Sequence, residues 1–207
     1  MKREPGERTL LTSVILSAPG PVVVGIGLFL GRSSTQIADF VRRSAELVAI
    51  VVSFLVYRMA NRGNADRGRL ERIANLCVGG AMCLSGALML FIAFFSKSAE
   101  KGNVLPGLAI AVLGVVTNTW LWLRYRRLDR GKPDAILRAQ SRLYRAKSLV
   151  DACVTAALLT VAIAPGAPAA HFMDIGGSIV VAVYLIVNGV LALRATSAAT
   201  SRDTRRA

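Results

Sequence analysis

Long apolar stretches alternate with short charged stretches along the whole chain. Six apolar blocks cover Leu10–Phe29, Gln36–Tyr57, Ile73–Phe95, Val104–Leu123, Leu149–Ala164 and Phe172–Leu193. A helix needs about 20 mostly apolar residues to cross a bilayer, and most of these blocks are near that length. None of them shows the alternation of a membrane β-strand. The pattern predicts an all-α integral membrane protein, a six-transmembrane-helix bundle.

Two of the predicted spans contain ionised side chains. The fifth apolar block is short, so its helix should begin earlier, near Arg145. That helix then contains Lys147 and Asp151. Charge in hydrocarbon is costly, so such residues usually face the bundle interior or a wet cavity and mark a pathway. The pairs Arg42/Glu46 and Lys147/Asp151 are both spaced i, i+4, on one helical face. The transport-site candidates are Asp39, Arg42, Glu46, Lys147 and Asp151.

The net charge of +14 reflects topology more than a nucleic-acid partner. Nineteen Lys and Arg residues lie in the two tails and the even-numbered connections, whereas the odd-numbered connections carry three, Arg32, Lys97 and Lys101. This is the positive-inside bias, which predicts that both termini are cytoplasmic. We therefore expect a multi-pass protein of a bacterial inner (cell) membrane, in contact with the lipid bilayer and not with nucleic acid.

Local sequence features indicate a helical bundle. Pro19 and Pro21 in the first span remove backbone donors and should kink that helix. The third span is rich in Gly, Ala and Ser, which permits close helix contact. The aromatic residues Trp120, Trp122 and Tyr125, with Tyr57 and Tyr144, gather at the predicted cytoplasmic ends; they could form an interfacial belt, although simple packing is the favoured interpretation.

Enzymatic and histidine-rich metal chemistry find little support. His171 is the single histidine, and the three cysteines form no Cys-x-x-Cys pair. A catalytic Ser/His/Asp set and a histidine-rich zinc site are therefore excluded in practice. We expect a protein that is not an enzyme and that carries no cofactor.

Four short motifs, in order along the chain, give it a family resemblance. They are Ser33-Ser34-Thr35-Gln36-Ile37-Ala38-Asp39; Gly68-Arg69-Leu70-Glu71-Arg72-Ile73-Ala74, with a shortened Gly–Arg spacing; Leu137-Arg138-Ala139 followed by Ser148-Leu149-Val150-Asp151; and Asp174-Ile175-Gly176-Gly177-Ser178. Over residues 10 to 196 the chain resembles the transmembrane domain of the cation diffusion facilitators. The resemblance implies a six-helix exporter that exchanges a divalent cation, zinc or manganese, for protons.

The chain departs from that family at the metal site. The resemblance places the four metal-binding positions of the family, two on the second helix and two on the fifth, at Arg42, Glu46, Lys147 and Asp151. Two acids remain, but their partners are cations. Arginine has no acceptor atom and keeps its proton. Any metal ligation would fall to Glu46 and Asp151, and the two cations stand where a bound metal would supply positive charge.

The predicted domain organisation is simple. Residues 1–9 form a cytoplasmic N-terminal tail, residues 10–196 the six-helix domain, and residues 197–207 a short cytoplasmic tail. That tail is too small to bury a core, so the cytoplasmic domain common in the resembling family is not expected. A homodimer would then form through membrane helices, for which the third span is a plausible surface.

Two function classes stay open from sequence. In the first, the protein is a cation diffusion facilitator-like transporter with altered ligands, and Lys147 titrates as the group that couples transport to protons. In the second, it is a non-transporting pseudo-transporter. The ionised quartet would then lock the second helix to the fifth, and the protein would act as a structural or regulatory membrane partner.

Overall fold

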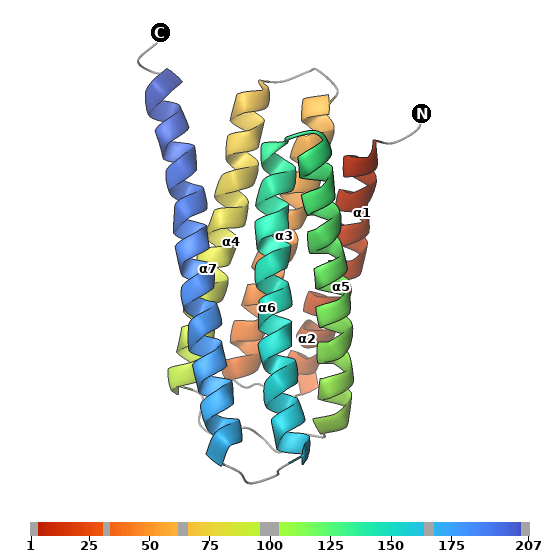
Figure 1. Ribbon diagram of the computed structural model, residues 1–207, viewed down its shortest axis with the longest axis vertical. Helices are drawn as coiled ribbons and strands as arrows, with labels where there is room; N and C mark the ends of the chain where they lie inside the picture. The colour runs from red at the N-terminus through yellow and green to blue at the C-terminus, as the bar shows by residue number, and fades with distance from the viewer. Residues whose placement is uncertain (1–3, 31–33, 62–65, 96–103, 164–167, 204–207) are drawn as a thin grey trace.

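The computed structural model describes residues 4–30, 34–61, 66–95, 104–163 and 168–203. Its helices, drawn in Figure 1, are α1 (Pro5–Ser17), α2 (Pro19–Leu30), α3 (Ser34–Asn61), α4 (Arg67–Phe95), α5 (Val104–Gly131), α6 (Ala135–Ile163) and α7 (Pro168–Asp203). From α3 to α7 each helix has 28 to 36 residues. At about 1.5 Å per residue, each exceeds the thickness of a bilayer core.

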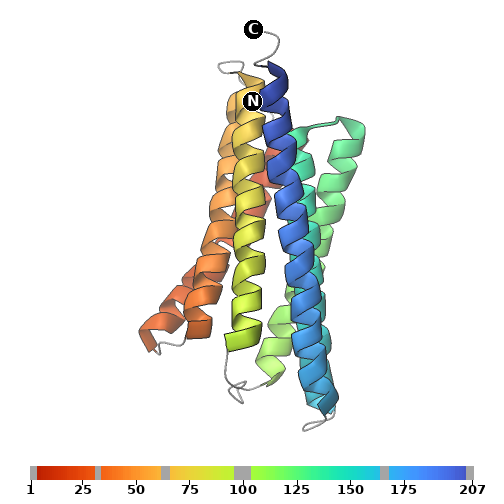
Figure 2. The same ribbon diagram turned by 90° about the vertical axis from the view of Figure 1, so that its left-hand side faces the viewer.

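The first predicted span is divided into two helices. α1 ends at Ser17 and α2 begins at Pro19, so the kink expected from the prolines is confirmed. Neither Pro19 nor Pro21 can donate a backbone hydrogen bond, and the preceding turn therefore loses two helical bonds. Figure 2 shows α2 and the start of α3 leaning away from α4 and α7. Counted as one broken span, α1 and α2 complete the six-helix bundle.

Successive spans run in opposite directions. α1 and α4 begin, and α3, α5 and α7 end, at the same end of the bundle (Figure 1). Within the described residues, Pro5–Ile26, Arg67–Phe95 and Leu108–Gly131 are long and apolar enough to cross a membrane, and Ile179–Arg194 is a shorter apolar helix. The α6 helix begins at Ala135, well before its apolar sequence, so Lys147 and Asp151 lie inside the helix as expected.

The helices α4 and α7 are joined by glycine contacts. A Cβ atom at Gly86 would lie 2.7 Å from Ile186 and 2.8 Å from the carbonyl oxygen of Ala182, and one at Gly189 would lie 2.8 Å from the carbonyl oxygen of Gly79. The two backbones can approach this closely only because these positions have no side chain. Part of the small-residue surface of the third span is therefore used within the chain.

The core near the basic end of the bundle contains two buried tyrosines. Tyr125 of α5 and Tyr144 of α6 are fully buried and stacked, with ring centroids 5.5 Å apart. Their hydroxyl groups bond Ser13 at 2.8 Å and Ser17 at 3.1 Å, which attaches α1 to α5 and α6. The packing interpretation is thus correct for these two rings, and they take no part in an interfacial belt.

We expect Gly86→Ala to lower the free energy of unfolding by about 1–3 kcal/mol, because the added methyl group forces α4 and α7 apart. The matched control is Gly176→Ala in α7, where a Cβ atom meets nothing within 4 Å. That change should be neutral or stabilise the protein by up to about 1 kcal/mol, since alanine favours helix more than glycine does. Chemical unfolding in detergent measures both; equal losses would contradict the close α4–α7 contact.

Candidate functional site

A cavity of about 450 Å³ lies between the first broken span and helices α3, α5 and α6. Leu16, Ser17, Gly20 and Pro21 line it at the α1–α2 break. Its charged lining residues are Arg42, Arg43, Glu46, Lys147 and Asp151. The proline break therefore forms part of the wall of this cavity. Within the described residues, this is where ionised groups from α3 and α6 meet.

Glu46 is the most buried carboxylate of this site, with 5% of its surface exposed. Lys147 Nζ lies 3.4 Å from its Oε2 atom, and Arg42 Nη1 lies 4.0 Å from Oε1. The Ser85 hydroxyl of α4 donates to Oε1 at 3.1 Å. One carboxylate therefore connects α3, α4 and α6, and a buried charge with this many partners is strongly held.

A second ionic group lies on α3 around Asp39, two turns before Glu46. Arg42 Nη2 donates to Asp39 Oδ1 at 2.6 Å, and Arg43 Nε donates to Asp39 Oδ2 at 2.7 Å. Asp39 is thus shared by two guanidinium groups, and it is absent from the residues that line the cavity. The sequence predicted Asp39 as a transport-site residue, whereas in this arrangement its carboxylate holds Arg42 and Arg43.

Asp151 has a different environment. The Asn118 amide of α5 donates to its Oδ2 atom at 2.6 Å. Its carboxylate lies against Gly114, where a Cβ atom would come within 2.6 Å of Oδ2, so only glycine leaves room. Within the described residues no cation lies within 4.0 Å of this carboxylate. The shared helical face of Lys147 and Asp151 suggested a pair between them, but the ion pair of Lys147 is with Glu46, across the interface between α6 and α3.

A family comparison identifies the class of membrane protein to which this bundle belongs. The family model described as the cation efflux transmembrane domain matches residues 10–199. The chain belongs to the cation efflux family, and its bundle is the integral membrane domain of a cation efflux-type transporter. No curated protein gives a significant match to the chain.

All five candidates predicted from sequence lie in one region, which joins α3 to α6. Sequence analysis missed Ser85, Asn118 and Arg43 as partners. Asn118 and its neighbours Thr117 and Thr119 are polar residues within an apolar span, a signal that was present but not used. Ser85 gave no such signal, because serine is common in tightly packed membrane helices. The side chains of His171 and Asp174 lie outside the described residues.

The ligand atoms that the described residues bring to the cavity do not suit a tetrahedral zinc ion. Zinc takes three or four N, S or O ligands, whereas the cavity offers two carboxylates among three cationic groups. No group of three His, Cys, Asp or Glu side chains lies together in the part of the chain that the structure describes. Counting Asp39, the local charge is three positive against three negative, so the site is neutral without a metal.

We expect Lys147→Ala to destabilise the protein by about 3–5 kcal/mol, because Glu46 stays buried and its nearest described cation is then Arg42, at 4.0 Å. A separate double variant, Glu46→Gln with Lys147→Met, should lose much less stability than Lys147→Ala, since both members of the pair are then uncharged. Thermal unfolding of the three proteins in one detergent makes the comparison. If the double variant were as unstable as Lys147→Ala, the 3.4 Å pair would not be the relevant interaction.

Proposed function

We propose that this protein exchanges a monovalent cation for a proton across the membrane, and that Lys147 is the group that releases the proton. The observation that supports the proposal is the ion pair between Lys147 and Glu46 at 3.4 Å, inside a cavity that Asp151 also lines. A cation that enters the cavity competes with the Lys147 ammonium group for carboxylate oxygens. The ammonium group can leave that competition by losing its proton.

Charge balance selects the substrate class. Of the three cationic groups at the site, Arg42 and Arg43 keep their protons at any working pH, so only Lys147 can become neutral. Loss of one proton makes room for one positive charge in this apolar setting. A monovalent cation restores neutrality, whereas a divalent cation leaves one uncompensated charge, which is costly away from water.

Asp151 is proposed as the first carboxylate that the entering cation meets. It has an amide partner, Asn118, and no cation within 4.0 Å in the described part of the chain, so its oxygens are the most available at the site. Oxygen ligands suit alkali cations. Glu46 becomes the second ligand when Lys147 withdraws, and Ser85 continues to hold its other oxygen atom.

The transport prediction uses Lys147→Arg, which keeps the positive charge and removes the exchangeable proton. In proteoliposomes with an internal pH dye, a Na⁺ or K⁺ gradient should drive proton movement through the parent protein. We expect Lys147→Arg to reduce this flux at least about tenfold, while thermal stability stays close to that of the parent, because Glu46 keeps a cationic partner. Lys132→Arg is the control, since Lys132 is exposed and outside the cavity.

Cation-driven proton flux that persists in Lys147→Arg would rule out Lys147 as the proton-releasing group. Absence of flux in the parent would instead favour the second candidate function, a non-transporting membrane partner. The contacts of Glu46 with three helices support that alternative, because they would serve equally well as a permanent lock between α3 and α6.

If the cations take the place of a metal, replacing them should create a metal site. The double change Arg42→His with Lys147→His leaves two imidazoles beside two carboxylates, a ligand set that zinc accepts. We expect this variant to gain a zinc-dependent rise in melting temperature, and to lose it when Asp151→Ala is added. A zinc-dependent rise already present in the parent and abolished by Asp151→Ala would contradict the metal-free site.

The proposal includes the orientation of the bundle in the membrane. With the basic end of the bundle in the cytoplasm of a bacterial cell, both ends of the chain are cytoplasmic, with the start of α1 at Pro5 and the end of α7 at Asp203 on that side. For a homodimer, the free face of α4 is the favoured surface: Leu76 and Leu84 are exposed there, and a Cβ atom at Gly80 would meet nothing within 4 Å. This face is separate from the α7 contact.

A further inference from the structure

We propose that the groove on the outer face of α5, near α1, binds the headgroup of an anionic phospholipid. A second cavity, of about 310 Å³, is lined by Trp120, Leu123, Arg124 and Arg127. It shares no lining residue with the transport cavity. The proposal rests on the charge, aromatic contact and apolar surface of this groove, and it is independent of the transported ion.

Arg124 is fixed in place with donors to spare. Its Nε atom donates to the Thr9 hydroxyl of α1 at 2.9 Å, and its guanidinium carbon lies 5.1 Å from the centre of the Trp120 ring. The Nη donors have no hydrogen-bond partner among the described residues. A guanidinium group held on an aromatic ring, with its fork of donors unused, suits bidentate binding of a phosphate.

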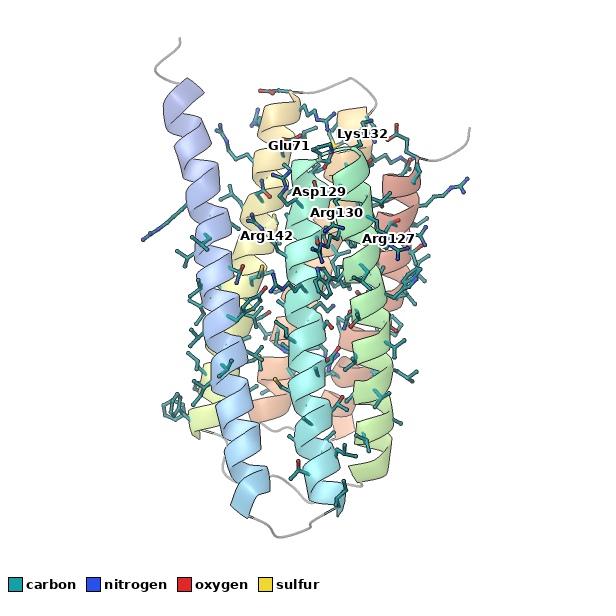
Figure 3. All side chains as sticks on the ribbon, in the orientation of Figure 1. Glu71, Arg127, Asp129, Arg130, Lys132 and Arg142 are labelled. Atoms are coloured by element: carbon teal, nitrogen blue, oxygen red, sulfur yellow. The ribbon has the colours of Figure 1, made fainter. Side chains whose placement is uncertain are left out.

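The two groove arginines differ from three other arginines at this end of the bundle. Arg58, Arg67 and Arg138 each lie within 4.0 Å of a carboxylate, on Glu7, Asp134 and Asp129 respectively. No described carboxylate lies within that distance of Arg124 or Arg127. Figure 3 shows Arg127 near the end of the bundle where α1 begins. The groove therefore carries two positive charges without an acidic partner.

The surface below the groove suits an acyl chain. Val116, Trp120 and Leu123 follow one face of α5 at helical spacing, with 62%, 45% and 40% of their surface exposed. The next position on that face is Arg127. The face thus changes from apolar to cationic along one line, as the chain and headgroup of a phospholipid do. Tryptophan, the residue at position 120 of this face, is enriched at membrane–water interfaces. A soluble phosphate would leave the apolar part uncovered.

The test measures the affinity of the purified full chain for short-chain phosphatidylglycerol by native mass spectrometry, with phosphatidylcholine and inorganic phosphate as separate arms. A juxtamembrane arginine contributes about fivefold in affinity for an anionic lipid. We therefore expect Arg124→Gln with Arg127→Gln to weaken phosphatidylglycerol binding about 25-fold. The charge-matched control, Arg69→Gln with Arg142→Gln, should change it less than about twofold.

Arg127→Gln alone guards against a folding defect from loss of the Arg124–Thr9 bond, and it should weaken binding about fivefold. Phosphatidylcholine should bind more weakly than phosphatidylglycerol, and millimolar inorganic phosphate should not displace the lipid. Equal weakening in the Arg69/Arg142 control would assign the effect to diffuse surface charge. Equal affinity for phosphatidylcholine, or displacement by phosphate, would also overturn the proposal.

Discussion

The ion pair between Lys147 and Glu46 is the interaction on which the other features of the bundle depend. It joins α6 to α3 in a region where an unpaired charge would be strongly disfavoured, and Ser85 extends it to α4. The members of the pair occupy positions where the family resemblance places metal ligands. The ammonium group of a lysine there supplies positive charge, so the fold can keep a carboxylate at this depth before any ion binds.

The surrounding helices leave a cavity beside the Lys147–Glu46 pair. The break between α1 and α2 at Ala18 borders the cavity through Leu16, Ser17, Gly20 and Pro21, and Ser17 at the break bonds Tyr144. Gly114 leaves room on α5 for the Asp151 carboxylate. On the opposite side, the glycine contacts of α4 with α7 hold Ser85 near Glu46. The ionised groups that line the cavity therefore include one carboxylate, Asp151, that has no cation within 4.0 Å among the described residues.

Much of this arrangement followed from sequence. Block lengths predicted six spans, and i, i+4 spacing put Arg42 with Glu46 and Lys147 with Asp151 on shared helix faces. Spacing within one helix could not predict which charge of α6 reaches α3, because that depends on helix rotation and on side-chain length. The long lysine side chain crosses to Glu46, while the shorter Asp151 reaches Asn118 on α5. The roles of Tyr125 and Tyr144 in the core were likewise set by packing with α1.

The protonation state of Lys147 is the most direct measure of the central claim. Nitrogen NMR of isotopically labelled lysine in lipid nanodiscs, with the Lys147 signal assigned by its loss in Lys147→Arg, follows the Nζ atom as Na⁺ or K⁺ is added. The account predicts a charged ammonium signal without the cation and conversion to the neutral amine as the cation saturates the site. An Nζ signal that stays charged at every cation concentration would contradict it.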